Sequence, residues 1–295
     1  MPLVRVNDSL RFEEHLHEGV GYYLIVKQVL IERNGIQRVL LFESPDHGKV
    51  LTIDESIQLT EREEATYHEA IVHVPLFAHG QAERVLIVGG GDGGVAARVL
   101  MHPGVNHLRQ IEIDETVVEI SREYLRSVHQ GAFDDPRFRL TIGDGAEFIR
   151  ATDERFDVII VDCSDPDPND STNNSLFTSE FYENARRALR PGGVLVTQNG
   201  MPNLQHDELE SSVSTLRRLF RYATCYLVDA PMYGGGNIAI GLATDSPEII
   251  ATPIETLRER FSASGVKCSN YTPEYHKAMF VLPKRVLEML GGKSY

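Results

Sequence analysis

The chain has 295 residues, of which 42% are hydrophobic and 24% charged, as in an ordinary globular protein with a substantial core. Its formal net charge of −14 at pH 7 argues against a nucleic-acid partner, because phosphates are bound by basic surfaces. No run approaches the roughly 20 apolar residues that span a bilayer, and the first residues lack the pattern of a signal peptide. We therefore expect a cytoplasmic protein with no membrane partner.

Residues 1–62 are predicted to form a small N-terminal antiparallel β domain. Its strand-like runs, with the turn signal Asn34-Gly35 among them, are residues 22–26, 37–42 and 49–53. The pattern becomes helical over residues 61–74, and Pro75 is expected to end or kink this helix.

Residues 63–295 are predicted to form an α/β domain, because strand-like and helical runs alternate from residue 85 onward. The expected strands are residues 85–88, 108–113, 138–142, 156–161 and 194–198. The expected helices are residues 95–101, 115–127, 146–150 and 179–189, the last closed by residues 190–193, and an antiparallel hairpin is expected over 223–228 and 237–243. The alternation predicts a doubly wound parallel sheet with ligand sites at the carboxyl ends of its strands.

The first of these strands runs into five glycines interrupted by Asp92. Glycine has no Cβ, so a ligand can approach the backbone of such a loop closely. An acid in the loop disfavours a phosphate and favours a ligand that carries positive charge. No lysine follows in a Gly-Lys-Ser/Thr pattern, which excludes a P-loop.

Acidic residues end the next three strands as well. Glu112 follows Asp92 by twenty residues and suits a bidentate hold on two ribose hydroxyls, while Asp144 suits an adenine amino group. Asp162 and Asp165 come at the end of the fourth strand. A single acid after a strand is more often a helix N-cap, and this interpretation is favoured for Asp114. Four acids at one edge of a sheet instead indicate a nucleoside joined to a cationic group, such as a sulfonium adenosine.

The motifs taken together resemble those of the polyamine aminopropyltransferases, and among them the spermidine synthases. The motifs that carry this resemblance are Gln58-Leu59-Thr60-Glu61-Arg62, Tyr67-His68-Glu69, Gly89-Gly90-Gly91-Asp92-Gly93-Gly94, Glu112-Ile113-Asp114, Gly143-Asp144-Gly145, Asp162-Cys163-Ser164-Asp165-Pro166, Ser175-Leu176-Phe177 and Pro231-Met232-Tyr233. The resemblance implies a Rossmann-like, methyltransferase-type sheet with a small N-terminal β domain, assembled as a homodimer or homotetramer. It also implies transfer of the aminopropyl group of decarboxylated S-adenosylmethionine, a co-substrate, to putrescine, giving spermidine and methylthioadenosine without a metal or other cofactor.

The resemblance assigns roles to individual residues of this chain. Those implied for the nucleoside are Gln37, Gly89, Gly91, Asp92, Glu112, Asp144 and Gly145, and those implied for the amine are Gln58, His68, Asp92, Asp162, Asp165 and Tyr233. We expect Asp162, with Tyr67, to take the proton from the attacking nitrogen as general base. The alternative interpretation makes Tyr67 and Tyr233 core aromatics, His68 an ordinary helix residue, and Gln37 and Gln58 exposed strand residues.

One segment departs from the family pattern. Residues 167–174 are longer and more polar than the family's loop over the substrates, and they predict a flexible lid. The acceptor amine therefore stays open at this point, with cadaverine, agmatine or spermidine as alternatives to putrescine. Two further alternatives are an S-adenosylmethionine-dependent methyltransferase and a binding protein without turnover.

Overall fold

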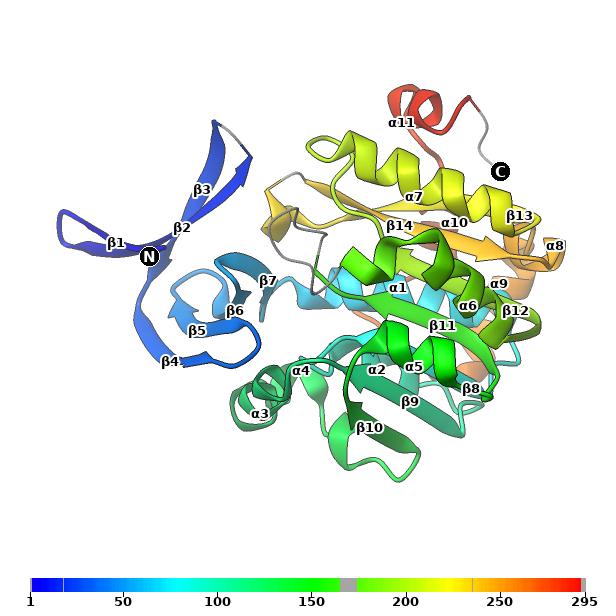
Figure 1. Cartoon of the computed structure of the whole chain (residues 1–295), viewed down its shortest axis with the longest axis horizontal. Coiled ribbons are helices and arrows are strands. Elements are labelled where there is room, and N and C mark those ends of the chain that lie inside the picture. The colour runs from blue at the N-terminus through cyan, green and yellow to red at the C-terminus, as the bar shows by residue number, and fades with distance from the viewer. Residues whose placement is uncertain (1, 18, 165–173, 235, 293–295) are drawn as a thin grey trace.

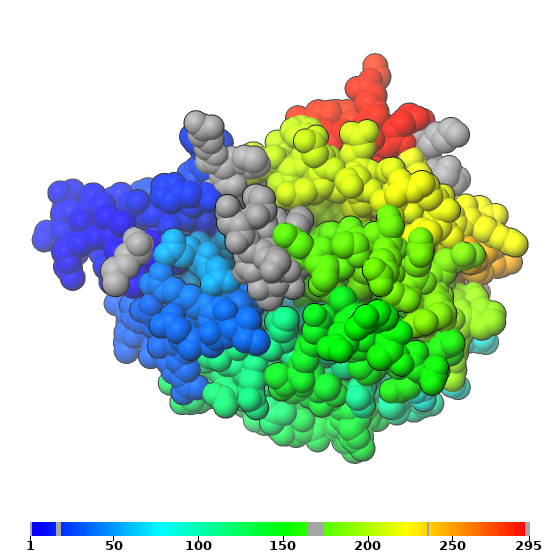
Figure 2. All heavy atoms as spheres, in the orientation of Figure 1, coloured from blue at the N-terminus to red at the C-terminus, as the bar shows by residue number. Residues whose placement is uncertain are grey.

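The computed structural model describes residues 2–17, 19–164, 174–234 and 236–292. Antiparallel N-terminal sheets are followed by a mixed central sheet with helices on its faces, so the predicted α/β class is confirmed (Figure 1). Figure 2 shows β1–β3 projecting to one side of the remainder of the molecule. No helix of the described residues combines the length and the apolar character needed to cross a membrane.

The N-terminal region forms two antiparallel sheets. Their strands are β1 (Leu3–Val6), β2 (Ser9–His17) and β3 (Val20–Val26) in the first, and β4 (Gln28–Asn34), β5 (Arg38–Ser44), β6 (Gly48–Ile53) and β7 (Ser56–Thr60) in the second. The three predicted runs correspond to β3, β5 and β6. The other four strands were missed; β4, for example, is an edge strand whose charged residues are exposed, which weakens the apolar signal.

Helix α1 (Glu64–His79) follows β7 and continues through Pro75, so the expected helix end there was wrong, and the expected kink stays a prediction. Proline removes one helical hydrogen bond, but nearly every residue of α1 is buried, and tertiary packing holds the helix together. The helix ends instead at Gly80, which adopts a left-handed conformation with φ of 76°. The predicted division into domains at residues 62 and 63 stays a prediction.

The central sheet has seven strands in the order β10-β9-β8-β11-β12-β14-β13. They are β8 (Arg84–Gly89), β9 (His107–Glu112), β10 (Phe138–Ile142), β11 (Phe156–Asp162), β12 (Leu189–Gln198), β13 (Tyr222–Asp229) and β14 (Asn237–Thr244). The first five in this order are parallel, and β13 and β14 form the predicted hairpin. The strand order reverses between β8 and β11, and ligands of such sheets bind at that reversal.

Helices cover both faces of this sheet. They are α2 (Gly94–Leu100), α3 (Glu115–Tyr124), α4 (Arg126–His129), α5 (Gly145–Ala151), α6 (Ser179–Ala188), α7 (His206–Leu219), α8 (Pro247–Ile250), α9 (Ile254–Ser264), α10 (Pro273–Met279) and α11 (Lys284–Met289), with short 3₁₀ turns η1 (Ala132–Asp134), η2 (Asn174–Phe177) and η3 (Pro231–Tyr233). Val85 and Ile87 of β8 belong to one core cluster, and Leu86 and Val88 belong to the other. Burial on both faces explains why this strand is an unbroken apolar run.

Two helix boundaries differ from the expectation. The predicted helix over residues 115–127 is divided at Leu125, which separates α3 from α4. Residues 190–193 do not close α6, which ends at Ala188, because they already belong to β12. A register shift against β11 accommodates them.

Glu69 ties the C-terminal segment to α1. Its buried carboxylate accepts backbone N–H bonds from Ser269, Asn270 and Tyr271 at 2.7, 2.7 and 2.8 Å. Glu69 belongs to the Tyr67-His68-Glu69 motif, but unlike Tyr67 and His68 it does not line the cavity of the candidate active site, and its role is structural.

We expect Glu69→Ala to lower the free energy of unfolding by about 2–4 kcal/mol, because three backbone N–H groups, one buried and two partly buried, lose a charged acceptor. Chemical denaturation followed by circular dichroism measures this change. The control is Glu259→Ala on the exposed side of α9, which should change stability by less than about 0.5 kcal/mol. Equal stability of the two variants would contradict the assigned role of Glu69.

Candidate active site

A cavity of about 440 Å³ opens at the carboxyl ends of the paired strands β8 and β11, and residues of the N-terminal sheets form its opposite wall. Among the described residues that line it are seven carboxylates and no lysine or arginine: Glu14, Asp54, Asp92, Glu112, Asp144, Asp162 and Glu208. All the predicted site residues that the structure describes lie there, namely Gln37, Gln58, Tyr67, His68, Gly89, Gly91, Asp92, Glu112, Asp144, Gly145, Asp162 and Tyr233. Asp165, and most of the expected lid at residues 167–174, lie outside the described residues.

The glycine loop forms the floor of the cavity and packs against the end of β11. Gly89 has φ of 86°, and a Cβ at this position would lie 2.0 Å from the carbonyl oxygen of Asp162. The N–H of Gly90 donates to the same oxygen at 2.8 Å. A Cβ on Gly91 would come within 2.9 Å of Glu112 Oε2. Glycine is therefore required here for close packing and to leave room for Glu112.

Glu112 ends β9 and is almost fully buried. Its Oε1 accepts the N–H of Asp114 at 2.9 Å, which orients the carboxyl group. Burial, with smaller contributions from Asp114 and Asp162, raises the pKa of Glu112 to about 7. No lysine or arginine among the described lining residues lies beside Glu112, and its buried carboxylate suits hydroxyl donors from a ligand.

Asp114 is the N-cap of α3, as predicted, because its Oδ1 accepts the N–H of Thr116 at 2.8 Å. Its Oδ2 accepts the backbone N–H of Gln37 at 3.0 Å, and so joins the N-terminal sheet to this wall. The side chain of Gln37 donates to Asp54 Oδ2 at 3.1 Å. Gln37 is thus a buried residue held from two sides, and the alternative of an exposed strand residue was wrong.

Asp144 caps a helix and also lines the cavity. Its Oδ1 caps α5 by accepting the N–H groups of Ala146 and Glu147 at 2.7 and 3.2 Å. The residue also lines the cavity and is exposed there. The two capping bonds to Oδ1 fix the orientation of the carboxyl group, and with it the position of Oδ2.

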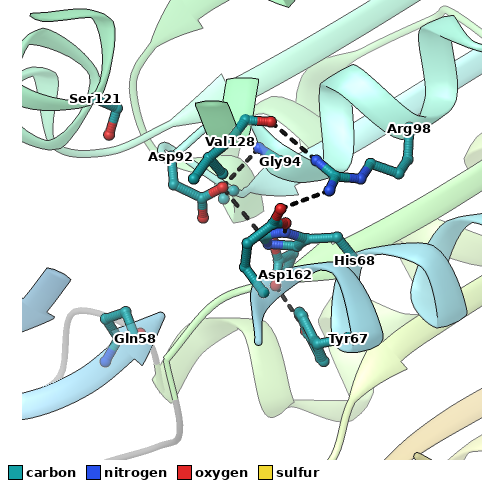
Figure 3. A network of polar contacts seen from close by, with 12 residues as sticks. Gln58, Tyr67, His68, Asp92, Gly94, Arg98, Ser121, Val128 and Asp162 are labelled. Atoms are coloured by element: carbon teal, nitrogen blue, oxygen red, sulfur yellow. Dashed lines mark hydrogen bonds and ion pairs between the residues drawn. The ribbon is translucent and has the colours of Figure 1, made fainter. Parts of the chain in front are cut away.

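Two carboxylates and two ring side chains meet at the centre of the cavity (Figure 3). The Tyr67 hydroxyl donates to Asp162 Oδ1 at 2.7 Å. Burial, and after it Asp92, raise the pKa of Asp162 to about 6 against the opposing effects of His68 and the Tyr67 hydroxyl. His68 Nε2 lies 3.5 Å from Asp92 Oδ1. Asp162 is therefore poised to gain and lose a proton near neutral pH.

His68, Asp92 and Asp162 each offer one donor atom, and these atoms lie within 4.8 Å of one another. The other ring nitrogen of His68 lies 2.6 Å from Glu64 Oε2, so both nitrogens of the ring face carboxylates. An imidazole protonated at both nitrogens, the form that two facing carboxylates favour, has no lone pair to offer a metal ion. We therefore do not identify these residues as metal ligands, and the site suits an organic cation better.

Gln58 of β7 and Tyr233 together form one wall of the cavity. Tyr233 donates its hydroxyl hydrogen to the carbonyl oxygen of Gln58 at 2.7 Å, and Ser164 donates to the side-chain oxygen of Gln58 at 3.0 Å. The rings of Tyr233 and Tyr67 meet edge to face with centroids 6.1 Å apart. These contacts bring together segments that lie far apart in the sequence.

Three acidic lining residues were not predicted: Glu14 of β2, Asp54 of the turn between β6 and β7, and Glu208 of α7. They do not follow parallel strands, which was the pattern that revealed the other acids. Asp54 carries one local signal, because it sits in a tight turn with φ of 48°. Burial raises the pKa of Glu14, whose Oε1 accepts the N–H of Ile57 at 2.8 Å.

Comparison with known proteins agrees with this geometry. The family model described as spermine/spermidine synthase domain matches residues 64–253, and the spermidine synthase tetramerisation domain model matches residues 11–61. A polyamine aminopropyltransferase of Ruegeria sp. (strain TM1040) is 45% identical over 277 residues, which cover 94% of this chain and 96% of that protein. One from Serratia proteamaculans (strain 568) is 44% identical over 279 residues, with the same coverage of 94% and 96%.

Solved structures give the same answer. A spermidine synthase in complex with the transition-state analogue AdoDATO has a TM-score of 0.91 at 32% identity, covering 99% of this chain and 98% of that chain. Spermidine synthase from Thermotoga maritima has a TM-score of 0.89 at 32% identity, covering 98% and 97%. The chain therefore belongs to the spermine/spermidine synthase family, and the resemblance drawn from its motifs is confirmed. It is an enzyme of the transferase class, a polyamine aminopropyltransferase.

The raised pKa of Glu112 has a consequence for stability. The folded chain binds this proton more tightly than the unfolded chain, where the pKa is close to 4.5, so the contribution of Glu112 to stability falls as the pH rises from 4.5 to about 7. We expect Glu112→Gln to have a free energy of unfolding about 1–3 kcal/mol higher than that of the unchanged chain at pH 8, with little difference near pH 4.5. Glu147→Gln, at an exposed position, is the control and should have no such pH dependence. A gain that is absent at pH 8, or equal at both pH values, would contradict the assigned burial of charge.

Proposed function

We propose that this enzyme transfers the aminopropyl group of decarboxylated S-adenosylmethionine to putrescine, and that it needs no metal or other cofactor. The observation that carries the proposal is the acidic cavity, in which seven carboxylates have no lysine or arginine beside them among the described lining residues. Both substrates are cationic, so such a cavity attracts both of them. The names of the relatives, which are polyamine aminopropyltransferases and spermidine synthases, support the same reaction.

The nucleoside is placed on the β8 and β9 side of the cavity. Glu112 accepts both ribose hydroxyls, Asp144 accepts the adenine amino group with its free oxygen, and Gln37 closes this side from the N-terminal sheet. Gly89, Gly91 and Gly145 let the ligand lie against the backbone. The carboxylates Asp92 and Asp162 then face the aminopropyl amine.

The reaction is a displacement at the carbon beside a sulfonium. A carbon–nitrogen bond forms, the carbon–sulfur bond breaks, neutral methylthioadenosine leaves, and the new secondary amine gives up one proton. Because sulfonium is a good leaving group, the protein mainly has to align nitrogen, carbon and sulfur. Asp162 accepts the proton, since its pKa of about 6 keeps it mostly ionised at neutral pH, and Tyr67 orients it through the 2.7 Å bond.

Asp92 explains a preference for the decarboxylated ligand. Intact S-adenosylmethionine carries a carboxylate on the carbon that bears its amino group, and this group would meet Asp92 and Asp162 at close range. Like charges in a closed site repel strongly, whereas the decarboxylated ligand presents only its ammonium group there. On the acceptor side, Gln58, His68 and Tyr233 line the cavity around the amine, with Asp165 proposed for its remote ammonium.

We also propose that the chain is a homo-oligomer through its N-terminal sheets. The family model that matches residues 11–61 is described as a tetramerisation domain. Val20, Tyr23 and Ile25 of β3 are large hydrophobic residues with 44%, 50% and 37% exposure, which suits burial against a second copy. Light scattering distinguishes a dimer from a tetramer. The cytoplasmic location expected from the sequence stays a prediction.

The activity is tested by incubating the protein with decarboxylated or intact S-adenosylmethionine and a panel of amines, and identifying products by mass. We expect spermidine and methylthioadenosine from decarboxylated ligand and putrescine. Products from cadaverine, agmatine or spermidine alone would change the acceptor, and a methylated amine from the intact ligand would replace the reaction class proposed for this site.

We expect Asp162→Asn to lower kcat by at least about a hundredfold, because the isosteric amide cannot accept the proton. Tyr67→Phe should lower kcat less, since it removes only the orienting hydrogen bond. Steady-state kinetics and calorimetric titration with methylthioadenosine separate turnover from nucleoside binding, which should stay within about threefold of the unchanged enzyme. Near-normal turnover of Asp162→Asn would refute the base role.

A further inference from the structure

A chain of buried charged side chains lies beneath the two central carboxylates (Figure 3). Arg98 of α2 donates to the carbonyl oxygen of Val128 at 2.9 Å and lies 2.6 Å from Glu64 Oε1. The second oxygen of Glu64 lies 2.6 Å from His68 Nδ1, and His68 Nε2 faces Asp92. The exposed fractions of the Arg98, Glu64 and His68 side chains are 4%, 8% and 3%. Glu64 and Arg98 do not line the cavity themselves, so the proposed mechanism does not use them.

The contacts of His68 fix its charge. A neutral imidazole carries one N–H and one lone pair, and whichever nitrogen had the lone pair would point it at a carboxylate. Protonation of both nitrogens gives each carboxylate a donor. Burial raises the pKa of Glu64, but His68 and then Arg98 lower it below its usual value, so Glu64 is an acceptor here. Burial alone would lower the pKa of His68, but Asp92 and Glu64 together raise it.

The surroundings of the ring admit this one position. A Cβ on Gly94, the first residue of α2, would lie 2.2 Å from His68 Cε1, so the ring occupies the space that glycine leaves. The N–H of Gly94 donates to Asp92 Oδ1 at 2.6 Å, the same oxygen that faces His68. The charged and titratable groups around His68 are Glu64 and Tyr67 of α1, Asp92 of the glycine loop, Arg98 of α2 and Asp162 of β11.

We propose that Glu64, which Arg98 holds in place, is a positioning residue that keeps His68 cationic beneath Asp92, and thereby leaves Asp162 as the carboxylate that exchanges the proton. The proposal rests on the proposed function and adds to it the residues that divide the roles of two neighbouring acids. Asp92 accepts the N–H of Gly94 and faces the His68 ring at 3.5 Å, so it stays an anion that holds an ammonium group. Asp162 has a single neutral donor, Tyr67, and can take up a proton.

The test is Glu64→Gln, which keeps the shape of the side chain and removes its charge. Nuclear magnetic resonance of ring-labelled histidine should show the titration midpoint of His68 moving to lower pH by at least about one unit. A neutral His68 no longer lowers the pKa of Asp162, so the acid limb of the kcat profile should move to higher pH. We expect kcat at neutral pH to fall at least about tenfold, with the KM for the nucleoside within about threefold.

The matched control is Glu63→Gln, one residue earlier. Its carboxylate lies 3.1 Å from His47 Nδ1, outside the cavity, so its loss should leave both the His68 midpoint and the kcat profile unchanged. His68→Gln keeps the Arg98–Glu64 pair intact and should reproduce the shift of the acid limb. The His68→Gln variant therefore tests the proposal even if Glu64→Gln does not fold.

An unchanged His68 midpoint in folded Glu64→Gln would overturn the proposal, and so would an unchanged acid limb in His68→Gln. Failure of the proposed function has a different signature. An unchanged chain that forms no aminopropylated product would reject that function, while the histidine titration would still establish whether Glu64 holds the charge on His68.

Discussion

The burial of several carboxylates in one cavity is the constraint on which the site depends. Glu112 and Asp162 lie in the same cavity with no lysine or arginine beside them among the described lining residues, and burial raises the pKa of both. Such an arrangement is unfavourable in the empty protein and becomes favourable when a cation arrives. Binding of a cationic substrate thus relieves the unfavourable free energy of these buried charges. The rigid sheet to which the side chains are attached holds them in place.

The sheet supplies this rigidity through backbone contacts. The carbonyl oxygen of Asp162 lies so close to Gly89 that no side chain fits between them, and the N–H of Gly90 is bonded to it. The glycine loop and the end of β11 are therefore one unit, so a movement of the loop would carry Asp162 with it. The proposed alignment of the reacting atoms therefore depends on β8 and β11 being neighbours in the sheet, at the point where the strand order reverses.

Much of this was accessible from the sequence because the acids follow parallel strands. Asp92, Glu112, Asp144 and Asp162 were expected at one edge and lie in one cavity. Glu14 and Glu208 could not be found in this way, since a β-hairpin and a helix bring them in from elsewhere. Pro75 shows the converse error, because local propensity predicted a helix end where burial of α1 maintains the helix.

The acceptor wall is assembled from segments that neither half of the chain contains alone. Tyr22 of β3 is hydrogen-bonded to the carbonyl oxygen of Met232, and Tyr233 is bonded to that of Gln58. Under the proposed function, the preference for one amine over another depends on how these two regions meet. Substitutions in the outlying β-strands, remote from any reacting atom, would then change the choice of amine during evolution and leave the residues proposed for the nucleoside as they are.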